Sequence, residues 1–493
     1  MNKQAYNPFL PIDTYIPDGE PHIFGDRIYL FGSHDKEGGD TFCELDYEFF
    51  SAPLDDLTNW SSKGINYSAK QDALYTEERP YMYAPDVVCG NDGRYYLYYC
   101  LAGNKGDGGY HGPISVAVCD TPDGKYEYLG YVKNQDGTAF NKYICFDPSV
   151  MNDDGVIRLY YGTAMPWGIC LPKFIKAFAA PVFEKIYGKS KDEILSEPSV
   201  WGANTLTLCD DMLTVKNDAV RIIPEKTRGT DFEGHGFFEG SSIRKINGTY
   251  YFIYSSQLNH ELCYATSKYP DRDFKYGGTI VSAGDIGING RKEKDSLNTV
   301  GTTHGSIECI NGRWYVFYHR LTHGSDYSRQ ACAEAIEIKA DGSIEQAEIS
   351  SCGLNIKPLI AKGKYPSVIA CHITNGKMPR VSNKKYKKPI PMVTHKNGER
   401  YIANIDGKTT IVYKWFDFEN DNGTLELDID SNADCEIQVF ANNEIISKER
   451  ITPFGRKTVV LDYQIKNKNK QEISIRFFGK GKLDLYSFEF KEK

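Results

Sequence analysis

A short hairpin pattern repeats along the first two thirds of the sequence and limits the folds that the chain can adopt. In each copy an Asn-Gly or Asp-Gly pair, once reversed to Gly-Asp, is followed by alternating aromatic and aliphatic residues. The five copies begin at Gly25-Asp26, Asp92-Gly93, Asp154-Gly155, Asn247-Gly248 and Asn311-Gly312. Such pairs favour tight turns between antiparallel strands, because these turns require positive φ. Copies roughly 50 to 90 residues apart, each long enough for a four-stranded sheet, predict a five-bladed β-propeller.

Composition limits the partners and the number of domains. A chain of 493 residues exceeds one compact core, so two domains are expected. The net charge of −8 argues against a nucleic-acid partner, which needs a basic surface. The sequence has neither an apolar N-terminal signal nor a run of about 18 apolar residues, so no membrane partner is expected. Thirteen cysteines without a Cys-x-x-Cys pair favour a reducing cytoplasm, unless a signal has been trimmed.

Each predicted blade begins with a polar residue just ahead of, or at the start of, its inner strand. These residues are Asp18, Asp86, Asp147, Glu239 and His304. Inner strands of a propeller converge on its central axis. We therefore expect four acids and one histidine to approach a shared pocket.

Two positions carry most of the expected chemistry. Glu239 lies among aromatic and glycine residues, where burial raises a carboxyl pKa, so it is a candidate general acid. In the first blade Asp18 and Glu20 both precede the hairpin, and period-two alternation places them on the same side of a strand. Asp18-Gly19 is also a good turn dipeptide. Chemistry alone leaves the choice between these two carboxylates open.

The order of these motifs resembles glycoside hydrolase family 43 over roughly residues 7 to 350. The matching motifs are Asn7-Pro8, Tyr83-Ala84-Pro85-Asp86, Phe146-Asp147-Pro148-Ser149, Phe238-Glu239-Gly240-Ser241 and His304-Gly305-Ser306. The resemblance implies a five-bladed propeller that cleaves arabinofuranosyl, xylosyl or related linkages with inversion. The resemblance also implies that this hydrolysis needs no cofactor.

The resemblance also implies a role for each acid. Asp18 would be the general base, Glu239 the general acid, and Asp147 the residue that orients the acid and tunes its pKa. The family usually has Asp-Pro where this chain has Asp18-Gly19, but the distance to the first hairpin favours Asp18 over Glu20. Inversion requires the acid and base to lie about 6.5–9.5 Å apart, which residues on different blades can achieve.

Further residues are candidates for contacts with substrate or metal. The substrate-binding candidates are Asp86, Arg329, Trp167 and His235, the third of them in an irregular insertion after the third hairpin. Asp86 is alternatively structural, Arg329 a solvated residue at a strand start, and Trp167 a core residue. His304 resembles the family's central histidine, which helps to hold a structural calcium ion or a water on the axis, although a purely structural histidine fits the pattern too.

The propeller pattern stops after residue 346. We expect a catalytic domain at 1–350, a linker at 351–370 and a β-sandwich at 371–493, because short alternating strands follow at regular spacing. This last segment resembles carbohydrate-binding module family 6, especially around Trp415 and Tyr486. It either binds glycan or only braces the propeller.

The sequence thus predicts an inverting, exo-acting glycosidase that removes terminal pentosyl residues from arabinoxylan or its oligosaccharides, as an α-L-arabinofuranosidase, a β-xylosidase or both. The alternatives are an endo-arabinanase, a galactofuranosidase or a non-catalytic glycan-binding propeller. The sequence does not determine the sugar, the linkage, calcium occupancy or the oligomeric state.

Overall fold

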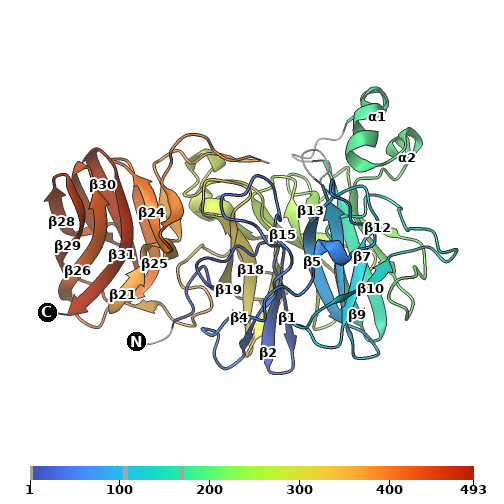
Figure 1. The fold of residues 1–493 in the computed structure, drawn as a ribbon, viewed down its shortest axis with the longest axis horizontal. Helices are drawn as coiled ribbons and strands as arrows, with labels where there is room; N and C mark the ends of the chain where they lie inside the picture. The colour runs from blue at the N-terminus through green and yellow to red at the C-terminus, as the bar shows by residue number, and fades with distance from the viewer. Residues whose placement is uncertain (1–3, 104–108, 166–170, 383, 493) are drawn as a thin grey trace.

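The computed structural model describes residues 4–103, 109–165, 171–382 and 384–492. Figure 1 shows two bodies, one built by the N-terminal strands and the other by the C-terminal strands (orange and red). Strands dominate both, so the predicted all-β class is confirmed. Within the described ranges, no helix is both long enough and apolar enough to cross a membrane.

The N-terminal body contains five antiparallel sheets that follow one another along the chain, each in the strand order of the sequence. Sheet one consists of β1 (Glu20–Phe24), β2 (Arg27–Phe31), β3 (Phe50–Pro53) and β4 (Ser61–Ser62). Sheet two consists of β5 (Tyr81–Cys89), β6 (Tyr95–Ala102), β7 (Ser115–Cys119) and β8 (Glu127–Tyr131). Sheet three consists of β9 (Ser149–Asp153), β10 (Val156–Thr163), β11 (Gly202–Thr207) and β12 (Val220–Pro224). Sheet four consists of β13 (Phe237–Ile246), β14 (Thr249–Ser256), β15 (Glu261–Ser267) and β16 (Lys275–Ser282), and sheet five of β17 (Ser306–Ile310), β18 (Arg313–Leu321) and β19 (Arg329–Ile336).

The predicted hairpins join the first two strands of each sheet. The turns at 154–155, 247–248 and 311–312 have positive φ at both residues, as a two-residue hairpin turn requires. The predicted hairpins are therefore confirmed, with Ile246 opposite Thr249 and Ile310 opposite Arg313.

The first strands of the five sheets meet one another in a closed circuit. β1 contacts β5, β5 contacts β9, β9 contacts β13, β13 contacts β17, and β17 contacts β1. The side chain of Asn7 also ties the N-terminus to sheet five, because its amide donates to the carbonyl of Ala333 and its oxygen accepts from the Ala333 amide. Residues at the starts of these first strands are thereby brought together.

Two six-stranded sheets form the C-terminal body. One contains β20 (Leu359–Ile360), β22 (His372–Thr374), β25 (Thr410–Asp417), β27 (Asp434–Ala441), β28 (Glu444–Ile451) and β30 (Gln471–Lys480). The other contains β21 (Gly363–Pro366), β23 (Met392–Lys396), β24 (Glu399–Ile405), β26 (Asn422–Ser431), β29 (Phe454–Gln464) and β31 (Leu483–Glu492). Alternate residues of both sheets share one apolar core, as in Ile437, Ile475, Leu427 and Phe488.

The expected linker at 351–370 needs correction, since it contains β20 and β21, which pair with β25 and β31. These strands have only two and four residues, too few for an alternating pattern to stand out in the sequence.

The insertion after the third hairpin is also more regular than expected. It contains α1 (Lys173–Tyr187) and α2 (Lys191–Leu195), which project from one end of the N-terminal body in Figure 1. The interior Pro181 and the exposed Phe174 and Phe178 hide the helical pattern of α1 in the sequence. Among the described residues, the short 3-10 helices include η1 (Ala69–Gln71), η3 (Ala283–Asp285), η4 (Ile288–Gly290), η5 (Glu293–Asp295) and η6 (Ser367–Ile369).

Candidate active site

Three acids from different sheets gather where the first strands begin. Asp18 and Asp147 lie two positions ahead of β1 and β9, and Glu239 is the third residue of β13. Asp18 and Asp147 both have left-handed backbones, with φ of 57° and 44°. Such conformations are uncommon for residues other than glycine and tend to concentrate at functional sites.

Asp18 is buried, with 5 % of its surface exposed, and is held in its ionised form. Nη1 of Arg329 donates to its Oδ1 at 2.8 Å. Burial alone would raise the pKa of Asp18, but the charge of Arg329 lowers it below the usual value. Asp18 is therefore a carboxylate near neutral pH.

A buried histidine fixes the backbone of this carboxylate. Nδ1 of His319 accepts a hydrogen bond from the Asp18 amide at 3.3 Å, and its Nε2 donates to the carbonyl of Thr302 at 3.0 Å. Burial, reinforced by the charge of Arg329, lowers the pKa of His319 to about 3. His319 is therefore neutral, and its two hydrogen bonds set its tautomer.

Asp35 holds Arg329 in place. Nε and Nη2 of Arg329 donate to the two oxygens of Asp35 at 2.8 and 2.9 Å, and Asp35 is 1 % exposed. This two-point pairing leaves Nη1 directed at Asp18. Arg329 was predicted to lie near the sugar; the structure places it against the candidate base instead of leaving it in solvent.

Glu239 and Asp147 form the opposite side of the cluster. Oδ2 of Asp147 accepts from the Gly240 amide at 2.9 Å, so this acid lies against the backbone that follows Glu239. Burial, and then the charges of Asp147 and Asp18, raise the pKa of Glu239 well above its usual value. The side chain of Glu239 is only partly buried. The pair therefore retains a proton near neutral pH, and Glu239 is the member that a ligand can reach.

His304 lies between the two aspartates. Its Nδ1 is 3.8 Å from Oδ1 of Asp18 and 4.0 Å from Oδ2 of Asp147. Its Nε2 is buried and has no hydrogen-bond partner among the described residues. Calcium prefers six to eight oxygen ligands. The free nitrogen offers one position, so His304 fits a calcium ion only where water supplies most of the other ligands.

Glu20 and Asp86 lie apart from this cluster. Oε2 of Glu20 pairs with Arg244 at 3.1 Å, and burial followed by the charge of Asp86 raises the pKa of Glu20 to about 8. The Oδ1 of Asp86 bonds to Nε2 of His22 at 2.7 Å, while its Oδ2 accepts from the amide of Val150 at 2.8 Å. Asp86 is fully buried, so this arrangement ties sheets one, two and three together and leaves no oxygen for a sugar.

His235 lines a cleft that contains none of the three acids Asp18, Asp147 and Glu239. Its Nδ1 lies 2.6 Å from Oε1 of Glu261, and its ring stacks on Tyr276 at 4.9 Å. These residues line an open cleft of about 610 Å³ with His260 and Arg291. Trp167, the remaining predicted sugar contact, lies outside the described residues, whereas Trp201 is fully buried in the core.

Sequence reasoning missed Asp35 and His319. Asp35 is separated from Arg329 by 294 positions, so no local pattern connects them. The only available signal was the Ser33-His34-Asp35 segment directly after the first hairpin.

Comparison with known proteins agrees, over most of the chain, with the family that the sequence motifs resemble. A family model described as glycosyl hydrolases family 43 matches residues 7–179 and 186–344. A xylosidase/arabinosidase of Thermoclostridium stercorarium is 42 % identical over 467 residues, covering 91 % of this chain and 90 % of that protein. A xylosidase/arabinosidase of Bacteroides ovatus is 30 % identical and covers 68 % of this chain and 96 % of its own.

Solved structures add the fold. A family 43 β-xylosidase/α-arabinofuranosidase from a compost metagenome, in complex with xylotriose and calcium-free, has a TM-score of 0.51 at 26 % identity and covers 69 % of this chain and 96 % of its own. An arabinoxylan arabinofuranohydrolase of Bacillus subtilis has a TM-score of 0.50 at 18 % identity and covers 100 % of this chain and 98 % of its own. The second likeness extends through the C-terminal body.

Proposed function

This chain belongs to glycosyl hydrolases family 43, and on that premise we propose that it is an inverting, exo-acting xylosidase/arabinosidase. It is a glycoside hydrolase, as the sequence predicted. Its substrates are terminal xylosyl or arabinofuranosyl groups of arabinoxylan or of its oligosaccharides. The observation that carries this proposal is one cluster in which the pKa of Asp18 is lowered by Arg329 and that of Glu239 is raised by burial and by Asp147.

The proposed reaction uses the two protonation states in one displacement. Glu239 donates its proton to the leaving oxygen, while Asp18 removes a proton from a water that attacks the sugar from the opposite face. Arg329 keeps Asp18 ionised until that step. Asp147 stays beside Glu239 and favours the protonated acid through charge repulsion. The reaction needs no cofactor.

The five N-terminal sheets are proposed to be the blades of one β-propeller. The closed circuit of contacts between their first strands supports this arrangement. It explains how acids up to 221 positions apart, as Asp18 and Glu239 are, reach one site.

The two C-terminal sheets are proposed to form a sandwich like carbohydrate-binding module family 6, which braces the propeller. Buried charges cross the junction: Nζ of Lys414 lies 3.1 Å from Oδ2 of Asp285, and Arg400 forms a two-point pair with Glu37. Trp415 is only partly buried, but its backbone amide contacts Cys352 at this same junction. A glycan-array screen that compares Trp415→Ala with wild type tests whether this surface binds glycan. Unchanged glycan binding in the variant supports the bracing role.

Two smaller proposals follow from individual residues. A calcium ion held by Nε2 of His304 and by water would be structural; added calcium should then raise the melting temperature of wild type but not of His304→Ala. The twelve described cysteines are free thiols, which supports a reducing compartment such as the cytoplasm. Titration of all thirteen thiols in protein from its native host tests this location.

Activity on a panel of substrates tests the proposed specificity. We expect release of single pentoses from 4-nitrophenyl β-D-xylopyranoside, from the matching α-L-arabinofuranoside and from xylo-oligosaccharides. Release of arabinan oligomers would instead favour an endo-arabinanase, and preference for the β-D-galactofuranoside a galactofuranosidase. No turnover of any of them would favour the non-catalytic glycan-binding propeller.

Replacing Asp35 with Asn should lower kcat with little change in KM. The variant loses the charge that holds Arg329, and a hydrogen bond to a charged group contributes about 1.5–3 kcal/mol, which corresponds to roughly 10- to 150-fold in rate. The matched control is Glu37→Gln, which breaks a similar arginine pair two positions away that reaches the C-terminal body. Both variants should lower the melting temperature, but only Asp35→Asn should lower kcat. Equal kcat values in the two variants would contradict the positioning role.

A further inference from the structure

His235, Glu261 and Cys263 form a cluster of three side chains that can bind a metal ion, beside the cleft that His235 lines. Glu261 and Cys263 are two positions apart in β15, so their side chains lie on the same side of this strand. His235 reaches them from the segment that leads into β13. One donor atom of each residue lies within 4.8 Å of the other two. A nitrogen, an oxygen and a sulfur are thus available at one point.

This mixture of donor atoms indicates the class of metal. Calcium and magnesium prefer oxygen ligands, whereas zinc is bound by histidine nitrogen, cysteine thiolate and carboxylate oxygen. Each of the three residues supplies a different one of these donors. Zinc sites with three protein ligands keep a fourth tetrahedral position for water. The cluster therefore fits a zinc site with three protein ligands.

The cluster is buried on the protein side and open on the side of the cleft. Cys263 is fully buried and Glu261 is 4 % exposed, whereas the side chain of His235 is 35 % exposed. His235 and Glu261 both line the cleft, which has a volume of about 610 Å³. An ion can enter through this cleft, and a water in the cleft can supply the fourth ligand.

Neighbouring hydroxyl groups hold the two candidate ligands of β15. Oγ of Ser256 donates to Oε1 of Glu261 at 2.6 Å, and Oγ1 of Thr279 donates to Oε2 of Glu261 at 3.0 Å. Oγ1 of Thr279 also lies 3.7 Å from Sγ of Cys263. Hydrogen bonds of this kind orient the ligands of metal sites. Glu261 and Cys263 are therefore held in place without an ion.

The hydrogen bond between His235 and Glu261 is the contact that an ion replaces. Nδ1 of His235 lies 2.6 Å from Oε1 of Glu261. Zinc holds nitrogen and oxygen ligands at about 2.0–2.2 Å, which places two ligands of a tetrahedral site roughly 3.4 Å apart. The imidazole therefore has to move by less than about 1 Å. Its ring stacks on Tyr276 with 12° between the two planes, so it can slide along that ring.

We propose that His235, Glu261 and Cys263 bind one zinc ion, with water as the fourth ligand. The ion links the segment ahead of β13 to β15 and stabilises this end of sheet four. This proposal is independent of the catalytic roles assigned above, because none of the three side chains belongs to the acid cluster.

Zinc titration of the metal-free, full-length protein tests the site. Calorimetry should show one zinc per chain, and the melting temperature should rise with zinc concentration, because the ion binds the folded state. Thr279→Val loses a hydrogen bond to Glu261 but no ligand, and it should weaken zinc binding by about 10- to 100-fold. Cys263→Ser loses a ligand and should weaken it by more than about 100-fold. Equal zinc affinity of wild type and Cys263→Ser would overturn the proposal.

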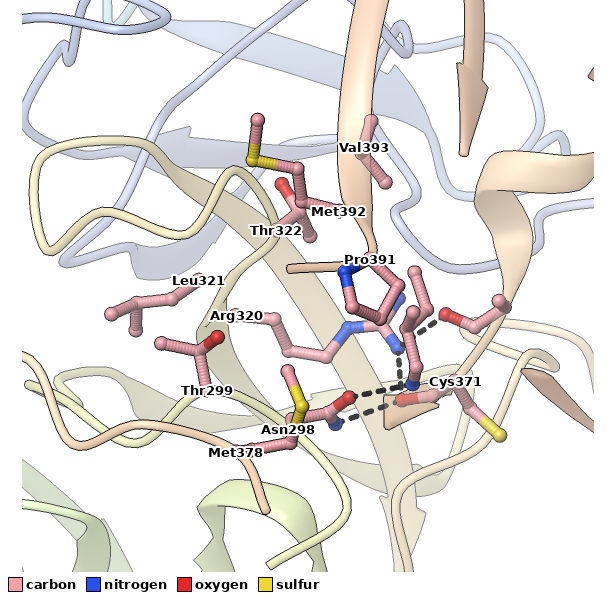
Figure 2. A pocket seen from close by; sticks show the side chains of 12 residues that line it. Asn298, Thr299, Arg320, Leu321, Thr322, Cys371, Met378, Pro391, Met392 and Val393 are labelled. Carbon is pink, nitrogen blue, oxygen red and sulfur yellow. Dashed lines mark hydrogen bonds between the residues drawn. The ribbon is translucent and has the colours of Figure 1, made fainter. Parts of the chain in front are cut away.

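The matched control is Cys371→Ser. Cys371 is buried like Cys263, but the described residues that line its cavity include neither a carboxylate nor an imidazole. Figure 2 shows this cavity, where Asn298, Arg320 and Met378 are among the neighbours of Cys371. This variant should bind zinc as wild type does. Loss of zinc binding in Cys371→Ser but not in Cys263→Ser would overturn the proposal.

Two measurements on wild type decide the result even if Cys263→Ser fails to fold. Cobalt(II) in place of zinc should give the near-ultraviolet charge-transfer absorption of a thiolate–cobalt bond, and absence of this absorption would overturn the proposal. Crystals grown with zinc should show an anomalous peak between Nδ1 of His235 and Sγ of Cys263. Zinc peaks only at other positions would mean that binding is adventitious and would overturn the proposal.

Discussion

Replacing Glu239 with Gln is expected to lower kcat on xylobiose by about 10²–10⁴-fold, the usual contribution of a general acid. The loss should be much smaller with 4-nitrophenyl xyloside, because 4-nitrophenolate departs without needing a proton. The raised pKa of Glu239 places the alkaline limb of the wild-type rate profile above the usual carboxyl range. That limb should disappear in the variant, which initial rates across pH on both substrates will measure.

The control for this experiment is Glu233→Gln. Glu233 is exposed in the segment that leads into β13, and its Oε2 accepts a hydrogen bond from the Gly229 amide. Its substitution should therefore leave both rates unchanged. An equal loss on xylobiose and on the aryl xyloside in Glu239→Gln would contradict the role of general acid.

Replacing Asp18 with Asn is expected to lower kcat by about 10²–10⁴-fold on both kinds of substrate. The attacking water needs a base whatever the leaving group is, so an activated aryl group gives no relief. Because the pKa of Asp18 is lowered, the base is ionised at and above mildly acidic pH, and wild-type activity should fall only as pH drops through this lowered value. Initial rates on xylobiose and 4-nitrophenyl xyloside measure the loss.

Glu20→Gln is the matched control for Asp18. Since the pKa of Glu20 is about 8, its carboxyl is largely protonated at neutral pH, and Gln resembles that form. This variant should keep its activity. A large loss in Glu20→Gln with an active Asp18→Asn would reverse the choice between the two residues.

Local patterns were sufficient to predict the repeated sheets and the acids at their starts. Asn247-Gly248 and Asn311-Gly312 encode their turns through positive φ, which depends on those residues alone. The hairpin that comes next in the sequence locates each of the acids Asp18, Asp147 and Glu239. Their convergence depends on the ring, which the repeat predicts.

Interactions over long sequence distances could not be predicted in this way. The pairs of Arg329 with Asp35 and of His319 with Asp18 join opposite ends of the N-terminal body. The sequence predicts the same position for Asp86 in its blade as for Asp18, yet His22 and Val150 bond to the Asp86 oxygens, which only the packing of three sheets determines. The helix α1 was missed because Phe174 and Phe178 are exposed and Pro181 interrupts its pattern, although Phe183 and Tyr187 are buried.

The anomer released in the first turnovers tests the central claim most directly. If a water activated by Asp18 attacks opposite the bond that Glu239 protonates, a β-xyloside must yield α-xylose before mutarotation. Proton NMR during rapid hydrolysis of xylobiose should show the α anomeric signal first, with the β signal growing later. Initial β-xylose would mean retention and would contradict the assignment of Asp18 as a base acting through water.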